Sequence, residues 1–103
     1  AYINPLDRFG IARGNFCGSQ ILPGLRRYLD TSDIAGLIAP RPLLLEMGTG
    51  DRCFFFQDLW KGYESVKKIY ENAGAGNQLW KDIHPGGHAF SGKKAAAFFR
   101  QYL

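Results

Sequence analysis

Two strand-like segments that each stop at a glycine turn, with one amphipathic segment between them, constrain the fold of this chain most strongly. Residues 43–47 are apolar except for one glutamate, and they stop at the Gly-Thr-Gly-Asp turn of residues 48–51. Residues 78–83 form a second, more polar run that stops at the Pro-Gly-Gly-His turn of residues 85–88. Between them, apolar side chains recur mostly at spacings of three and four over residues 57–73, which indicates a helix with one buried face. The pattern predicts a β-α-β unit with two parallel strands.

Short helices are expected on both sides of this unit. Thr31 or Ser32 can cap a helix that Pro40 and Pro42 prevent from continuing. After the second glycine turn, Ser91 is expected to cap a last helix. The buried stripe of that last helix would consist of Ala95, Phe98, Phe99 and Tyr102.

The length and the number of strands bound the domain organisation. The chain has 103 residues, of which 46% are hydrophobic, and this suffices for one modest core. We expect a single partial α/β domain, with an irregular lid-like or connecting segment over residues 1–30 and a strand-helix-strand-helix order over residues 31–103. Two parallel strands do not usually form a stable sheet alone, because both faces and both edges need partners. The sheet is therefore expected to be completed by a missing N-terminal half or by a second copy of the chain.

Charge and hydropathy argue against two classes of partner. The formal net charge is +4, but the basic residues are scattered in pairs, so nucleic-acid binding is not expected. No stretch approaches the ~20 apolar residues of a membrane span, and the N-terminus lacks the layout of a signal peptide. Cys17 and Cys53 lack the Cys-x-x-Cys spacing of a redox or zinc site, which indicates reduced thiols and a cytoplasmic location.

Asp51 and His88 are the candidate catalytic residues. Each has an ordinary structural explanation, since aspartate is common in turns and a histidine after glycines often caps or packs. Together they follow the carboxyl ends of two consecutive parallel strands, where the acid and base of a catalytic triad are usually mounted in an open α/β sheet. A buried carboxylate bonded to one ring nitrogen would hold the tautomer of the imidazole and stabilise the cation that forms when it acts as a base. The sequence therefore predicts an acid–base pair.

His84 and Glu46 are weaker candidates. His84 and His88 have the four-residue spacing of metal ligands on a helix, but Pro85 and two glycines exclude a helix there, and Asp82 completes no known ligand spacing. No metal and no cofactor are therefore expected. Glu46 interrupts an apolar strand, and we expect its carboxylate to be paired or solvated near the strand end, because unpaired burial is costly.

A catalytic nucleophile is not evident. None of the serines lies in the Gly-x-Ser-x-Gly turn that exposes a nucleophilic serine between a strand and a helix. Cys17 lacks such a turn too, although cysteine can replace serine in this chemistry. The serines are Ser19, Ser32, Ser65 and Ser91. The chain is expected to carry an acid and a base without a nucleophile, like the second half of an enzyme.

Three short motifs carry a resemblance to a known family. They are Ala-Pro-Arg-Pro at residues 39–42, Gly-Thr-Gly-Asp at residues 48–51 and Gly-Gly-His-Ala-Phe at residues 86–90. With them, the stretch over residues 23–90 resembles the C-terminal part of an α/β-hydrolase, and within that superfamily the dienelactone hydrolase and acetyl xylan esterase-like group. These motifs are fairly specific to the superfamily and poorly specific to a substrate.

The resemblance implies roles for the residues of the two turns. It implies that Asp51 is the triad acid and His88 the triad base, and that a serine elbow and an oxyanion hole lie upstream of Ala1. In such enzymes a proline often follows the acid, whereas this chain has Cys-Phe-Phe-Phe at residues 53–56. That aromatic run is expected to pack in the core more than to line a substrate pocket.

Three hypotheses for function remain open. The first is the C-terminal fragment of a serine-type carboxylic ester hydrolase, which would act on a small ester when completed and be inactive alone. The second is a non-catalytic remnant that self-associates through strand edges and an aromatic surface at residues 54–56. The third is a split enzyme, in which a separate N-terminal chain supplies the serine.

Overall fold

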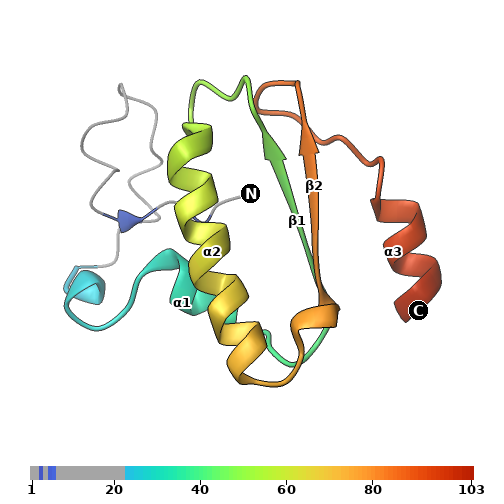
Figure 1. Cartoon of the computed structure of the whole chain (residues 1–103). Helices are drawn as coiled ribbons and strands as arrows, with labels where there is room; N and C mark the ends of the chain where they lie inside the picture. Colours follow the sequence, from blue (N-terminus) through green and yellow to red (C-terminus); the bar gives the residue numbers. More distant parts are fainter. Residues whose placement is uncertain (1–2, 4, 7–22) are drawn as a thin grey trace.

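The computed structural model describes Ile3, Pro5, Leu6 and residues 23–103. The elements follow in the order α1 (Thr31–Gly36), β1 (Leu43–Gly48), α2 (Phe56–Asn72), β2 (Leu79–His84) and α3 (Ala95–Tyr102), with short 3-10 helices at Leu25–Arg27 and Gly76–Gln78 (Figure 1). The two strands pair in parallel, with Leu43 opposite Leu79 and Gly48 opposite His84. The fold of the described residues is therefore mixed α/β with a small parallel sheet, as predicted, and each strand and the long helix lie within one residue of their predicted ends.

The helix α2 covers one face of the sheet. Its apolar stripe, which includes Leu59, Val66 and Tyr70, is fully buried and packs in one core with Leu45 and Met47 of β1. Side chains alternate along a strand, so Leu45 and Met47 point to the same face of β1. The other members of this core are Ile3, Tyr63 and Ala75.

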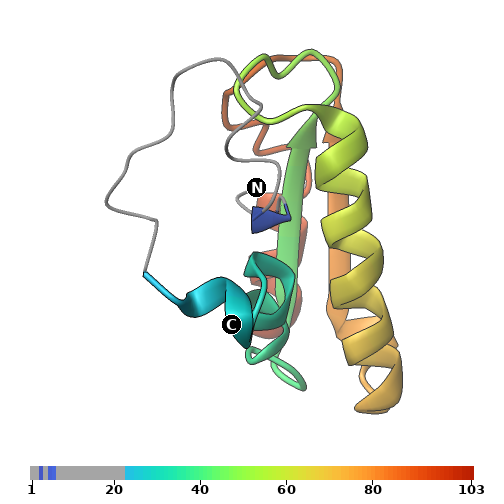
Figure 2. The ribbon, with the colours of Figure 1, turned by 90° about the vertical axis from the view of Figure 1, so that its left-hand side faces the viewer.

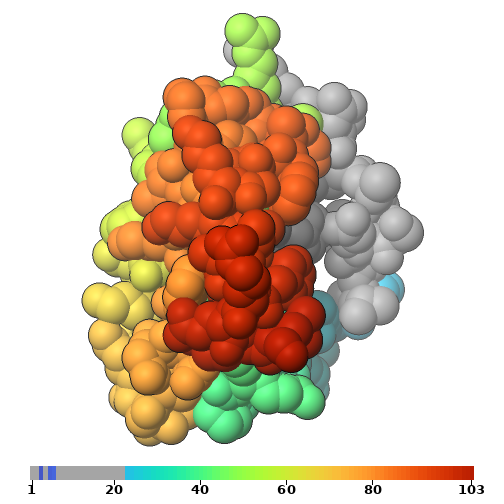
Figure 3. All heavy atoms as spheres, turned by 90° about the vertical axis from the view of Figure 1, so that its right-hand side faces the viewer, coloured from blue at the N-terminus to red at the C-terminus, as the bar shows by residue number. Residues whose placement is uncertain are grey.

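The helix α3 lies on the opposite side of β2 from α2 (Figure 2). Trp80 of β2 contacts it edge-on, with ring centroids 5.7 Å from Phe98 and 6.1 Å from Tyr102. Seen from that side, α3 covers the middle of the molecule, below the loop that leaves β2 (Figure 3). The two strands thus lie between helices, as parallel strands require.

The helix caps differ from the predicted ones. The predicted cap at Thr31 or Ser32 is wrong by one position, because Asp30 caps α1 and forms a reciprocal capping box with Asp33. The predicted cap at Ser91 is wrong, since α3 begins only at Ala95 and its first turn receives no side-chain cap from Lys94. The Ser91 hydroxyl instead donates a hydrogen bond to a carboxylate on β2, which no local pattern reveals.

One lysine of β2 lies against the aromatic side chains of α2. The Lys81 ammonium is 4.8 Å from the ring centroid of Trp60 and 4.9 Å from that of Tyr63. Such contacts are favourable because the faces of aromatic rings are electron-rich. A positive charge is thereby held on β2, whose outer edge has no paired strand in the described part of the chain.

The segment predicted to be lid-like lies largely outside the described residues. Of residues 1–30, the structure describes Ile3, Pro5, Leu6 and residues 23–30, which include the 3-10 helix at Leu25–Arg27. Within the described ranges, no helix has the length and apolar character needed to cross a membrane.

We expect Tyr70→Phe to lower the free energy of unfolding by about 1 kcal/mol. The Tyr70 hydroxyl is buried and donates a 2.7 Å hydrogen bond to the carbonyl oxygen of Arg41, just before β1, so its loss leaves that carbonyl without this donor. Urea denaturation measures the change. Tyr102→Phe is the matched control, because the Tyr102 hydroxyl makes a longer, exposed bond of 3.4 Å to Asn77. Equal losses in the two variants would contradict the assignment.

Candidate acid–base site

The turns that follow β1 and β2 are bonded to each other through their backbones. Thr49 N–H donates to the carbonyl oxygen of His84 at 2.9 Å, and Gly50 N–H donates to that of Gly86 at 3.1 Å. Gly48 allows this approach, because a Cβ atom at its position would overlap the carbonyl oxygens of the facing turn. The parallel register and the absence of a side chain at Gly48 therefore bring the two turns into contact.

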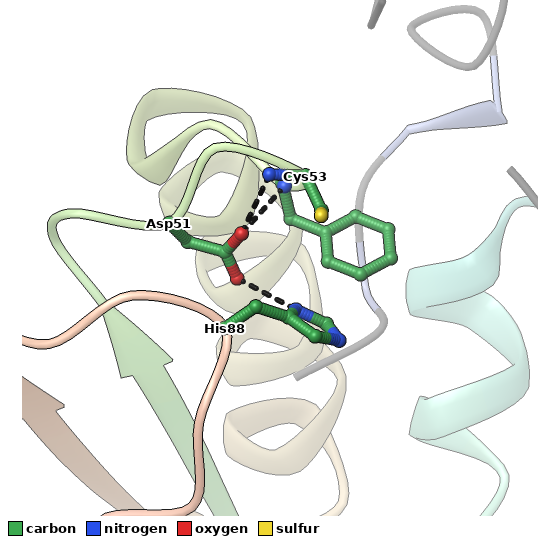
Figure 4. A network of polar contacts seen from close by, with 4 residues as sticks. Asp51, Cys53 and His88 are labelled. Atoms are coloured by element: carbon green, nitrogen blue, oxygen red, sulfur yellow. Dashed lines mark hydrogen bonds and ion pairs between the residues drawn. The ribbon is translucent and has the colours of Figure 1, made fainter. Parts of the chain in front are cut away.

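Asp51 is held by the turn in which it lies. Its Oδ1 atom accepts hydrogen bonds from Cys53 N–H at 2.7 Å and from Phe54 N–H at 3.0 Å. Only 4% of its side chain is exposed. An aspartate that accepts from the backbone two and three residues ahead forms a compact local turn. The carboxylate is thus oriented by its own segment, with Oδ2 directed at the facing turn (Figure 4).

His88 faces that second oxygen. Its Nδ1 atom lies 3.0 Å from Asp51 Oδ2, and the other ring nitrogen is on the far side of the ring (Figure 4). An ionised carboxylate only accepts hydrogen bonds, so Nδ1 carries the hydrogen of this bond and the neutral ring leaves Nε2 as an acceptor. The His88 side chain is 59% exposed, and the Phe54 ring lies beside it with centroids 5.2 Å apart. The structure therefore brings the two predicted site residues together, with the base accessible.

Hydrogen bonding decides the charge state of Asp51. Burial alone would raise the pKa of this carboxyl, because desolvation disfavours the charged form. The Phe54 N–H, the His88 ring and the Cys53 N–H outweigh burial and lower the pKa below the ordinary value of 3.8. Asp51 is therefore ionised at neutral pH, as an acid that orients an imidazole must be.

The lowered pKa predicts a dependence of stability on pH. Because the folded pKa of Asp51 is below the unfolded one, its ionised form stabilises the fold above pH of about 4, and this contribution is lost as the pH falls through the folded pKa. We expect the difference in unfolding free energy between the wild type and Asp51→Asn to be constant near neutral pH and to shrink below pH of about 4. Urea denaturation across this range measures it. A difference that grows on acidification would contradict the predicted sign.

A small cavity opens beside the pair. Its volume is about 260 Å³, slightly below the range of typical ligand pockets. Its lining comes from β1, β2 and both turns: Glu46, Gly48, Asp51, His84, Gly87, His88, Ala89 and Phe90. The cavity is of the right size for a small group next to His88.

The other histidine lines the same cavity but, like the described serines, is not bonded to the pair. His84 is buried, and its Nδ1 accepts a 3.2 Å hydrogen bond from Gly86 N–H in the same turn. Ser65 bonds to a backbone carbonyl within α2, and Ser91 bonds to Asp82. Ser32 is buried in α1. Ser19 and Cys17 lie outside the described residues.

Cys53 was missed by sequence reasoning as a member of this site. Its thiol, a carboxylate oxygen of Asp51 and a ring nitrogen of His88 all lie within 4.8 Å of one another. In the described part of the chain these are the residues that could offer three ligand atoms to a metal ion, whereas the sequence spacing pointed only to His84 and His88. The signal in the sequence was the aspartate turn itself. An aspartate that accepts hydrogen bonds from the backbone two and three residues ahead brings the side chains of those residues close to its carboxylate.

Comparisons with family models, with curated proteins and with solved structures find no match for this chain.

Proposed function

We propose that this chain supplies the acid and the base of a serine-type carboxylic ester hydrolase, as the C-terminal part of an α/β-hydrolase. The observation that carries the proposal is the 3.0 Å contact between Asp51 Oδ2 and His88 Nδ1 at the carboxyl ends of parallel strands. The motifs at residues 39–42, 48–51 and 86–90, which resemble the dienelactone hydrolase and acetyl xylan esterase-like group, add support. Neither a metal nor a cofactor is needed for this chemistry.

In the proposed reaction, His88 acts through its accessible ring nitrogen. Nε2 takes the proton of a serine hydroxyl as that oxygen attacks the ester carbonyl, and it returns the proton to the leaving alcohol. Nε2 then takes a proton from a water molecule as the water oxygen attacks the acyl carbonyl, and it passes that proton to the serine oxygen as the acid is released. Asp51 holds the imidazole in the required tautomer and stabilises the transient cation. The serine and the oxyanion donors would come from an N-terminal half, which either precedes Ala1 in the same chain or is a separate chain.

Labelling with a fluorophosphonate probe, together with turnover of an activated acetate ester, tests the proposal. The 103-residue chain should give neither signal, because loss of the nucleophile alone costs about 10⁶ in kcat in a related chemistry. Labelling that disappears in His88→Ala would instead place a nucleophile within this chain, and Ser19→Ala and Cys17→Ala would then locate it.

The complementary experiment measures esterase activity in a protein that includes the nucleophile. This protein is either a longer chain that carries the N-terminal half, or a mixture of this chain with a separate N-terminal chain. Turnover that depends on His88 should appear there. A completed protein without such turnover would contradict the proposal.

A second candidate function is self-association without catalysis. An apolar groove of about 530 Å³ follows β1, and it is lined by residues of β1, the α1 region and α3, including Leu44, Phe90 and Phe99. Of the aromatic run expected to form an interface, Phe54 and Phe56 pack against the core and Phe55 is exposed. Sedimentation analysis separates the two candidates, since this function needs a stable oligomer and no esterase activity in any completed form.

A further inference from the structure

Two carboxylates lie side by side on the face of the sheet that α2 does not cover. Glu46 of β1 and Asp82 of β2 are register partners, and paired residues of parallel strands point to the same face. Asp82 is 2% exposed and Glu46 is partly buried. Like charges in such positions destabilise a sheet unless hydrogen-bond donors surround them. The two neighbouring carboxylates therefore require hydrogen-bond donors close by.

One short segment, residues 91–94, donates hydrogen bonds to both carboxylates. Glu46 Oε2 accepts from Ser91 N–H at 3.1 Å, and Glu46 Oε1 accepts from Gly92 N–H at 2.9 Å. Asp82 Oδ2 accepts from the Ser91 hydroxyl at 3.0 Å and from Lys94 N–H at 3.3 Å. Since α3 has no side-chain cap of its own, these carboxylates also place negative charge at its N-terminal end, where it is favourable.

The segment they hold begins three residues after His88. The other end of the His88 loop is fixed by the backbone bonds from Thr49 and Gly50 to the turn after β2. Only residues 87–90 lie between the two fixed ends, and Ala89 N–H bonds to Gly87 within them at 2.9 Å. The position of His88 relative to Asp51 is therefore set from both sides.

We propose that Glu46 and Asp82 are positioning residues for His88. They fix the C-terminal end of the His88 loop through a carboxylate pair on the sheet, and so maintain the contact between the imidazole and Asp51. The catalytic meaning of this role rests on the proposed hydrolase function, whereas the structural effect on His88 does not. Catalytic groups must be held within a fraction of an ångström, which makes such support part of the site.

Glu46→Gln tests the proposal with little change in shape. The two oxygens of Glu46 each accept one backbone N–H, whereas glutamine has one acceptor oxygen and would turn an N–H₂ group toward the other donor. NMR of the histidine-labelled chain can then follow the His88 Nδ1 proton. We expect its exchange with water to accelerate by about tenfold, the factor that follows from weakening one hydrogen bond.

Two further variants make the result decisive. Glu71→Gln is the matched control, because Glu71 is exposed and pairs with Lys67 at 3.4 Å on the surface of α2, so the His88 signal should stay as in the wild type. Ser91→Ala removes the hydroxyl bond to Asp82, together with the long 3.4 Å bond that the hydroxyl accepts from Lys93 N–H, and should accelerate exchange less, in the same direction. It decides the matter if Glu46→Gln does not fold.

A folded Glu46→Gln with wild-type His88 exchange would overturn the proposal, as would an unchanged Ser91→Ala if only that variant folds. These readouts need no turnover, so a failure of the hydrolase proposal would be seen separately, in the esterase assay of the completed protein.

Discussion

In a protein that joins this chain to its nucleophile, Asp51→Asn should lower kcat by about 10⁴ and His88→Ala by about 10⁶. Asparagine keeps one acceptor oxygen for the Cys53 and Phe54 N–H groups, but its amide would face the Nδ1–H of His88. The ring would then favour the opposite tautomer, with the hydrogen on the nitrogen that must accept the serine proton. Removing the ring eliminates the base altogether, which explains the larger loss.

Stability measurements separate a chemical role from a structural one. Because the His88 side chain is 59% exposed, His88→Ala should change the free energy of unfolding by less than about 1 kcal/mol while activity disappears. KM should change little, since the imidazole acts mainly on the transition state. Initial rates on an activated acetate ester provide both constants. If His88→Ala retained more than about a hundredth of wild-type kcat, His88 would not be the base.

Gly48→Ala should have the second largest effect, a loss of about 2–3 kcal/mol in unfolding free energy. The added methyl group would overlap the backbone oxygens of Gly86 and Gly87, and neither can move without separating the two turns. The bonds from Thr49 and Gly50 to the turn after β2 would weaken, and the contact between His88 and Asp51 with them. Thermal and urea denaturation measure the loss, and the NMR signal of His88 reports on the contact.

Gly76→Ala is the matched control for this change. A Cβ atom at Gly76 would meet only Glu71 Cγ, at an ordinary distance of 3.5 Å, so stability should stay the same or rise slightly. If both glycine variants behave alike, the close approach of the two turns is not what Gly48 provides.

The sequence was sufficient for the features that depend on local periodicity. The helical spacing over residues 57–73, the apolar run before Gly48 and the more polar run over residues 78–83 predicted α2, β1 and β2 to within one residue. The proximity of Asp51 and His88 followed from the rule that parallel strands present their carboxyl ends at one edge. The register of β1 against β2 was not needed for that prediction, because both residues lie in the short turns that follow the strand ends.

Features that depend on distant partners were not predictable in the same way. Ser91 has the chemistry of a helix cap, but Asp82 of β2 accepts its hydroxyl hydrogen, and the helix starts four residues later. Glu46 was expected to be paired or solvated, yet its donors are 45 and 46 positions away in the chain. Pairing across such distances leaves no periodic signal in a single sequence.

The lysine on β2 has a consequence for how copies of this chain would assemble. A strand added beside β2 would bring its side chains next to the Lys81 ammonium, which is already engaged by Trp60 and Tyr63, and charges in edge strands oppose such addition. Among the described residues, the edge of β1 is then the one at which we expect a further strand to add. If two copies paired through β1 around a twofold axis, the β1 edge of each copy would be occupied by the other. Association would then stop at a closed dimer and would not continue into a fibre.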